Sequence, residues 1–280
     1  MQLKNFHDII SGYRYIYISP HFDDVVYSCS GAIAAQVRME QRPLVITVFG
    51  GIPPTGMKLS AFASQLHKTM GFCLGLGRGR LSIARSARTV MFARRKEDSS
   101  ALTYLQADYL WLDYLDCVYR GTPPYYTQVS QLVGGDVHPD DISISKQLAQ
   151  GLLMIHERLP DVTWYLPLGV GKHIDHQIVA AAAVSLIRRG AYVKFYEDFP
   201  YVLREGRLQK RLGELGGSFE PTLVDISEVL NLRIKAAELY SSQVDISFGS
   251  GEAMYKAIRD YTQNILPEKT GYLERYWEVC

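Results

Sequence analysis

The sequence lacks the features that several large classes of protein require. It has no excess of either charge, because 30 basic and 29 acidic side chains leave a net charge of +1 over 280 residues. That balance argues against a nucleic-acid binder whose affinity rests on many phosphate contacts. No apolar run approaches the roughly 20 residues that a membrane-spanning helix needs, and residues 1–11 lack the apolar stretch of a signal peptide. We therefore expect neither nucleic-acid partners nor a membrane span.

Cysteine is scarce and scattered. Cys29, Cys73, Cys117 and Cys280 form no Cys-x-x-Cys pair, so we expect neither a disulfide framework nor a zinc site built from cysteine. We interpret them as reduced thiols and expect a cytoplasmic protein. Hydrophobic residues make up 47% and charged residues 21% of the chain, which excludes global disorder. With no repeat or linker, residues 1–280 are expected to form a single domain.

The chain does contain a regular alternation of extended and helical patterns. Strands are predicted at residues 13–19, 43–50, 109–112, 162–168 and 192–196. Helices are predicted at residues 30–42, 60–71, 97–106, 141–159, 174–189, 231–241 and 252–264. The repetition of strand and helix predicts an α/β fold with a Rossmann-like, mostly parallel sheet and helices on both faces. In such sheets the chemistry lies in loops at the carboxyl ends of the strands.

The first candidate site follows the strand expected at residues 13–19. His21, Asp23 and Asp24 stand at its carboxyl end, before a helix. A helix N-cap would explain one aspartate, but it does not require two carboxylates and an imidazole. Imidazole and carboxylate groups bind divalent metals, and the second carboxylate would remain available as a base. The pattern therefore favours a metal site.

A second polar cluster follows the strand expected at residues 162–168. It contains His173, Asp175 and His176, which alone would be explained by a capping aspartate and two solvated histidines. Because both clusters occupy the same topological position, we expect them to meet in one crevice. Two histidines and an aspartate leave one position open for water, as in a catalytic zinc site. The same ligand set also accepts Fe²⁺.

A literal His-Pro-Asp-Asp occurs elsewhere, at residues 138–141. It follows two glycines rather than a strand, and it leads into the helix expected at residues 141–159. We interpret it as a helix start in which Asp140 or Asp141 is the cap, with the proline directly before it. We therefore expect no functional role for His138.

With these residues in view, the chain resembles the PIG-L/LmbE-like family of zinc-dependent N-deacetylases. That family acts mainly on N-acetylglucosamine-type amino sugars attached to a second group. Its first signature is a strand followed by His-Pro-Asp-Asp-Glu, where residues 21–25 read His-Phe-Asp-Asp-Val. Its second signature, His-x-Asp-His, is matched by residues 173–176. Weaker similarities at residues 94–105, 112–116 and 235–243 extend the resemblance over about residues 13–245 and imply an LmbE-like fold.

The resemblance and the ligand chemistry imply that His21, Asp24 and His176 hold Zn²⁺. Asp23 is then placed as the general base, which takes a proton from water and returns it to the departing amine. His173, if protonated, would stabilise the oxyanion of the tetrahedral intermediate. Asp175 would either keep His173 charged and oriented or merely cap its helix.

Other side chains are candidates for the substrate-binding surface. Arg94 and Asp116 would contact sugar hydroxyls, or would form ion pairs that hold loops together, Arg94 pairing with an aspartate or with Glu97. Some family members carry a tyrosine two positions before the first histidine of the second signature, where this chain has Gly171. A tyrosine that assists the oxyanion would have to come from elsewhere among the 19 in the chain. We expect the site rim at Tyr119, Tyr125 and Tyr126, together with Arg120, Pro123 and Pro124. Residues 197–201, from Glu197 and Asp198 to Tyr201, follow a strand and are also expected to line the crevice.

The predicted function is metal-dependent removal of an N-acetyl group from an amino sugar or its conjugate, a small-molecule substrate. Two alternatives stay open, namely amide hydrolysis of a non-sugar or lipidated conjugate and a non-catalytic sugar-binding protein of the same fold. A binding protein needs neither the base Asp23 nor the acid His173, so their presence argues against that second alternative. An oligomer is compatible with the sequence.

Overall fold

An eight-stranded sheet forms the centre of the protein. The computed structural model describes residues 1–74 and 83–280, and the strands follow the order β1-β6-β3-β2-β7-β8-β10-β9. Neighbours from β1 to β8 pair in parallel, whereas β10 runs antiparallel to β8 and β9. The strands are β1 (Gln2–Leu3), β2 (Tyr15–Ser19), β3 (Pro43–Thr47), β6 (Asp108–Trp111), β7 (Thr163–Pro167), β8 (Tyr192–Tyr196), β9 (Phe219–Asp225) and β10 (Leu273–Val279). A separate pair, β4 (Cys73–Leu74) and β5 (Ile83–Ala84), lies outside this sheet.

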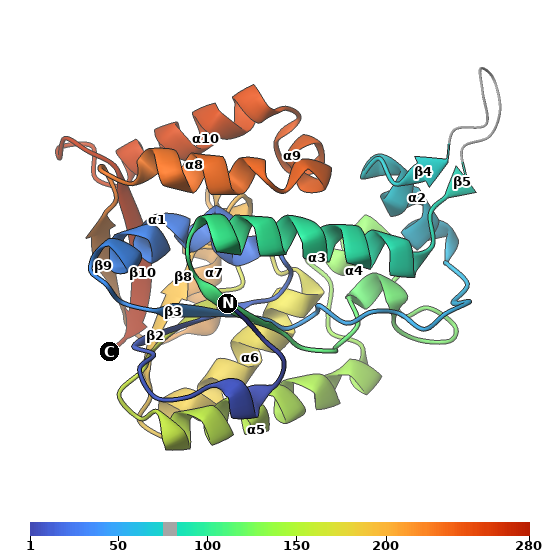
Figure 1. Ribbon diagram of the computed structural model, residues 1–280, viewed down its shortest axis with the longest axis horizontal. Coiled ribbons are helices and arrows are strands. Elements are labelled where there is room, and N and C mark those ends of the chain that lie inside the picture. The colour runs from blue at the N-terminus through green and yellow to red at the C-terminus, as the bar shows by residue number, and fades with distance from the viewer. Residues whose placement is uncertain (75–82) are drawn as a thin grey trace.

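Helices cover both faces of the sheet (Figure 1), which confirms the predicted Rossmann-like architecture. One face carries α1, α3, α8 and α10, and the other carries α5 and α6. The helices are α1 (Asp24–Arg38), α2 (Ala61–Thr69), α3 (Ala87–Tyr104), α4 (Val129–Leu132), α5 (Ile142–Arg158), α6 (Ile174–Arg188), α7 (Arg207–Leu215), α8 (Leu230–Glu238), α9 (Ser241–Phe248) and α10 (Gly251–Asn264). In the described part of the chain, none of them has the length and apolarity to cross a membrane.

Burial explains why the central strands are apolar throughout. The side chains of Ile16, Ile18, Leu44 and Ile46 are fully buried, because helices cover the sheet on both sides. Each such side chain contributes about 1.5–3 kcal/mol relative to an exposed one. These strands rigidly position the loops that follow their carboxyl ends.

Two helices begin earlier than the sequence patterns predict. We expected a helix from residue 30, but α1 begins at Asp24, because burial of Val25 and Val26 overrides the low helix propensity of valine. We expected a helix from residue 97, but α3 begins at Ala87, where the side chain of Ser86 accepts a capping hydrogen bond from Thr89. The predictions also missed β1, β4, β5, α4, α7, β9, α9 and β10.

A buried carboxylate ties the last strand to the first helix. Glu274 of β10 is 2% exposed and accepts hydrogen bonds from the backbone N–H groups of Gly31 and Ala32 in α1 at 2.9 and 2.8 Å. Arg233 of α8 pairs with the same carboxylate at 2.5 Å. A Cβ atom at position 31 would lie 2.6 Å from Glu274 Oε1, so this close approach requires glycine. The contact couples β10 and α8 to the helix that begins with Asp24.

Candidate metal-dependent active site

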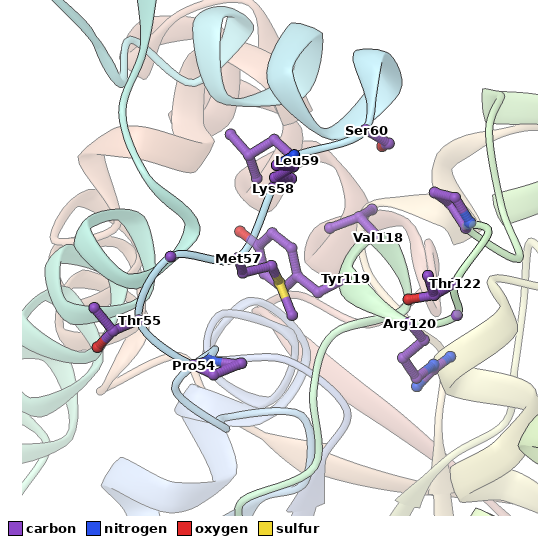
Figure 2. A pocket seen from close by; sticks show the side chains of 13 residues that line it. Pro54, Thr55, Met57, Lys58, Leu59, Ser60, Val118, Tyr119, Arg120 and Thr122 are labelled. Carbon is purple, nitrogen blue, oxygen red and sulfur yellow. The ribbon is translucent and has the colours of Figure 1, made fainter.

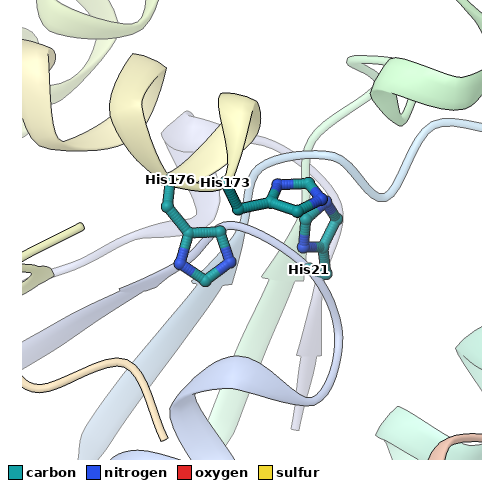
Figure 3. A group of neighbouring side chains, drawn as sticks. All are labelled: His21, His173 and His176. Carbon is teal, nitrogen blue, oxygen red and sulfur yellow. The ribbon is translucent and has the colours of Figure 1, made fainter. Parts of the chain in front are cut away.

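The two predicted polar clusters lie together at one edge of the sheet. β2 and β7 are parallel neighbours, so the loops that follow their carboxyl ends meet. The first loop supplies His21, and the start of α6 supplies His173 and His176 (Figure 3). The three imidazoles and the carboxylates of Asp23 and Asp24 are all buried. The expected convergence of distant segments is therefore observed.

Asp24 lies at the centre of this cluster. Its Oδ2 atom is 3.2 Å from Nδ1 of His21 and 3.2 Å from Nε2 of His176. Nε2 of His176 is buried and has no hydrogen-bond partner among the described residues. Nitrogen atoms of His21, His173 and His176 also lie within 4.8 Å of one another. An unpaired buried imidazole nitrogen beside a carboxylate and further imidazoles fits a divalent-metal site.

Two further carboxylates hold the outer nitrogens of the imidazoles. Asp198 accepts from Nδ1 of His176 at 2.6 Å, and Asp175 lies 2.9 Å from Nε2 of His21. Carboxylates in this position fix the orientation of metal-binding histidines and raise their basicity. Asp198 also accepts the backbone N–H groups of Gly169 and Val170, so it is itself immobilised.

Charge is closely balanced in this cluster. Burial alone would lower the pKa of His176, but the carboxylates of Asp24 and Asp198 raise it to about 9. Burial alone would raise the pKa of Asp24, but His176 and His21 hold it well below its usual range. Because metal binding requires neutral imidazoles, a cation bound here would replace these protons.

Asp23 stands beside the cluster in contact with a buried arginine. Arg94 lies 3.1 Å from Asp23 and 3.6 Å from Asp116, and all three line the same cavity. Burial raises the pKa of Asp23, although Arg94 opposes the shift. The predicted ion pairing of Arg94 with aspartate is present, whereas Glu97 instead accepts hydrogen bonds from Ser242 of α9.

The structure corrects the expected relation between Asp175 and His173. The Asp175 carboxylate contacts His21 and Arg120 and makes no cap, and although its charge raises the pKa of His173, burial and the neighbouring imidazoles outweigh it. His173 is the N-cap of α6, and its Nδ1 accepts the backbone N–H of Asp175. Burial, together with the neighbouring His21 and His176, holds the pKa of His173 well below its usual range. His173 is therefore neutral, with its proton on Nε2.

The second His-Pro-Asp-Asp lies away from this cavity. The ring of His138 stacks on Tyr125 with centroids 3.9 Å apart, and its Nδ1 accepts the N–H of Asp140. Tyr125 and Tyr126 bind Asp140 and Asp141, so the prediction that these two tyrosines form the site rim is wrong. Asp141 precedes α5 but makes no side-chain capping bond there.

Arg120 connects that segment to the metal cluster, a role that the sequence patterns did not reveal. Its guanidinium lies 2.5 Å from Asp175 and 3.0 Å from Asp141. Asp141 is held by this ion pair and by Tyr126, which explains why it does not cap α5. The chain of contacts runs from Asp141 through Arg120 and Asp175 to His21.

The cavity above the cluster measures about 170 Å³. Tyr201, one of the residues after β8 that were expected to line the crevice, does line it, and so do His67 of α2 and Gln243 and Ile246 of α9. The last three do not follow a predicted strand directly, so the rule of strand ends could not find them. Of the predicted rim residues, Tyr119 lines the cavity.

Glu197 and Asp198 follow β8 and were both expected to line the crevice. Asp198 lies behind His176 rather than on the cavity wall. Glu197 instead binds Arg275 and Trp277 of β10. Adjacent residues leaving a strand point to opposite sides, so one of the pair had to face away.

This fold and site define a metal-dependent hydrolase with a Rossmann-like sheet. The chain belongs to the PIG-L family, described as GlcNAc-PI de-N-acetylase, whose model matches residues 16–187. It is 28% identical over 251 residues to a 2'-N-acetylparomamine deacetylase of Niallia circulans, covering 87% of this chain and 88% of that protein. A 2'-N-acetylparomamine deacetylase of Streptomyces fradiae is 28% identical over 239 residues, covering 83% of this chain and 74% of that protein.

A solved structure supports the same assignment. It is a deacetylase–bog complex from the biosynthesis pathway of teicoplanin, with a TM-score of 0.77 and 25% sequence identity. The likeness covers 95% of this chain and 98% of that one. Together these relatives confirm the predicted family, the LmbE-like fold and the enzyme class, an N-deacetylase.

Proposed function

We propose that this enzyme uses zinc to remove the acetyl group from an N-acetylated amino sugar that carries a second group. His21, Asp24 and His176 would hold the metal. The observation that carries the proposal is the arrangement around Asp24, where two imidazole nitrogens lie 3.2 Å from one carboxylate oxygen. A second carboxylate, that of Asp23, remains beside them for proton transfer.

We prefer this ligand set to the group of three histidines. Each of the two proposed histidine ligands has its other nitrogen held by a carboxylate, Asp175 for His21 and Asp198 for His176, as is usual for metal-binding histidines. His173 lacks such a partner and uses Nδ1 to cap α6. Its remaining nitrogen therefore carries a proton and can donate rather than bind metal.

Each of the other residues at the site has a separate role in amide hydrolysis. Zinc held by His21, Asp24 and His176 would polarise the amide carbonyl and would lower the pKa of a water molecule to about 7. Asp23 accepts the proton of the attacking water and passes it to the departing amine. The Nε2–H group of His173 donates to the developing oxyanion, and it does so without a positive charge. Arg94 holds Asp23 in place and, with Asp116, faces the cavity where sugar hydroxyls would lie.

The substrate class follows from the relatives and from the size of the cavity. The curated relatives are deacetylases of 2'-N-acetylparomamine. The cavity of about 170 Å³ over the metal cluster is small compared with drug-sized pockets, so it suits an acetyl group rather than a long acyl chain. The cysteines form no disulfide in the described part of the chain, which supports a cytoplasmic location.

An acetate-release screen over N-acetylated sugars and their glycosides, run on protein of measured metal content, tests the proposal. We expect release that depends on bound zinc and is abolished by a chelator. Metal-replete enzyme that releases no acetate from any amino sugar, but hydrolyses other amides, would contradict it.

A further inference from the structure

A second and larger cavity lies beside the metal site. It measures about 600 Å³ and is enclosed by residues 54–60, which follow β3, and residues 118–124, which follow β6 (Figure 2). Val118 and Tyr119 line both this cavity and the one over the metal cluster. Because β3 and β6 are parallel neighbours, both cavities open on the same edge of the sheet.

The wall between the two cavities is fixed in position. Nδ1 of His67 lies 2.8 Å from the carbonyl oxygen of Arg85, which can only accept, so this nitrogen carries the proton. Burial lowers the pKa of His67, so Nε2 is unprotonated and accepts the hydroxyl of Tyr119 at 2.7 Å. Arg120, the next residue in the wall, pairs with Asp175 at 2.5 Å. The second cavity is thereby held at a constant distance from the metal cluster.

The residues that the structure describes contribute no negative charge to the lining of this cavity. None of its 13 residues is aspartate or glutamate. Its surface is mixed: Met57, Leu59 and Val118 contribute apolar side chains that Figure 2 shows around the hollow, and the hydroxyls of Thr55, Ser60 and Thr122 are uncharged. The charges present are both positive, on Lys58 and on Arg120, and that of Arg120 is neutralised by two aspartates. An ammonium group entering here would lose water and meet no counter-charge.

We propose that this cavity binds the second group of the substrate, the part that carries no acetamide, and that it selects an apolar ring system without ammonium groups. The inference rests on the proposed function, because it assumes that the acetamide lies over the metal cluster. It adds that an aromatic or otherwise apolar aglycone is preferred to a polyamine.

The test compares three substrates of similar core. They are N-acetylglucosamine, its phenyl glycoside and its aminoethyl glycoside, with kcat/KM for acetate release as the readout. Filling an apolar pocket typically changes kcat/KM by about 10–200-fold. We expect the phenyl glycoside to exceed the unsubstituted sugar by at least about tenfold, and the aminoethyl glycoside to gain nothing.

Charge-altering variants locate the preference in this cavity. Met57→Glu and Lys58→Glu each add a carboxylate to the lining, so both should reduce the advantage of the phenyl glycoside about tenfold and improve the aminoethyl glycoside. Turnover of unsubstituted N-acetylglucosamine should stay within about twofold, because that sugar does not reach the cavity. Met154→Glu is the matched control, since Met154 is exposed on α5, on the opposite side of the sheet from α3 and α8.

Equilibrium binding of the phenyl glycoside, measured by calorimetry, distinguishes a failure of the proposed function from a failure of the cavity assignment. If no sugar releases acetate but Met57→Glu still weakens binding about tenfold, the proposed function fails while the cavity assignment stands. If the phenyl glycoside is turned over and bound no better than the free sugar, or if both variants leave its binding unchanged, the cavity assignment is overturned.

Discussion

The chain contains two segments that read His-x-Asp-Asp, at residues 21–24 and at residues 138–141. Only the first lies in the candidate active site. The first follows the buried strand β2 and turns its carboxylates into a cavity with two further imidazoles. The second contains a 3-10 helix, Pro139–Asp141, and its histidine stacks on the ring of Tyr125. The local sequence does not distinguish the two segments. They differ in that a buried strand directly precedes the first and not the second.

The difference shows that a metal-binding motif acquires its chemistry from its position in the sheet. Residues at the carboxyl end of β2 meet those of the neighbouring β7, so ligands from two segments come together. Residues 138–141 instead contact Tyr125, Tyr126 and Arg120. Removal of an aspartate should therefore have very different effects on bound metal in the two segments.

The largest contrast is expected between Asp24→Ala and Asp140→Ala. The first removes the carboxylate that lies 3.2 Å from both His21 and His176, so the protein should lose most of its bound metal. The second removes an exposed side chain and should leave metal content unchanged. Metal analysis of both purified variants provides the check, and full occupancy in Asp24→Ala would remove Asp24 from the ligand set.

Asp23→Asn should separate metal binding from chemistry. The change is nearly isosteric and removes the charge and basicity of one carboxylate. We expect metal and substrate to bind while kcat falls about 10²–10⁴-fold, the usual contribution of a positioned acid–base group. Metal content and steady-state kinetics are measured on the same preparation. A metal-replete variant with near-normal kcat would contradict the assignment of Asp23 as the base.

Asp198→Asn should weaken metal binding, although Asp198 does not line the cavity. It removes the charge that holds Nδ1 of His176 at 2.6 Å, and loss of such supporting groups typically costs about 10–100-fold in metal affinity. Competition with a chelator of known affinity measures the change. An unaltered affinity would mean that His176 is oriented by its helix alone.

Asp141→Asn should affect folding stability more than the metal site. Arg120 would lose one of its two buried partners but keep Asp175, so we expect a loss of about 1–3 kcal/mol in the free energy of unfolding. Metal content should change little. Denaturant unfolding gives the stability, and a loss of metal equal to that of Asp24→Ala would show that the second segment belongs to the site after all.

The smallest effect is expected for His138→Ala. The side chain stacks on Tyr125 and is about one-third exposed, so the variant should lose about 1 kcal/mol or less. Metal content and kcat/KM should match the wild-type values. A large loss of metal or of kcat/KM would mean that residues 138–141 contribute to the metal site.

The sheet and the metal cluster were predictable because both depend on short-range patterns. Apolar runs such as residues 43–47 predict buried strands. Polar residues directly after such runs indicate the edge of the sheet at which the candidate site lies. The ion pairs of Arg120, a residue expected only at the site rim, were not predictable, because its partners Asp141 and Asp175 are brought to it by the tertiary fold. The antiparallel strands β9 and β10 were also missed, since β9 alternates exposed and half-buried residues.

The role of Asp175 shows where sequence spacing misleads. Its place two residues after His173 suggests that they interact through their side chains, but the first turn of α6 points its carboxylate toward His21. The resemblance to a family likewise implied a set of metal ligands without showing which carboxylate supports which imidazole. Such pairings depend on side-chain direction, which spacing along the chain does not determine.

The contact between Glu274 and α1 has a consequence for biosynthesis. The helix that begins with Asp24 is held through Gly31 and Ala32 by a residue about 250 positions later in the chain. Contacts of such long sequence separation form late, because the intervening chain must first be ordered. During translation, His21 and Asp24 leave the ribosome long before Glu274 is made. The nascent chain therefore displays these side chains on an unclamped helix, and the rigid metal centre matures only as synthesis nears its last strand.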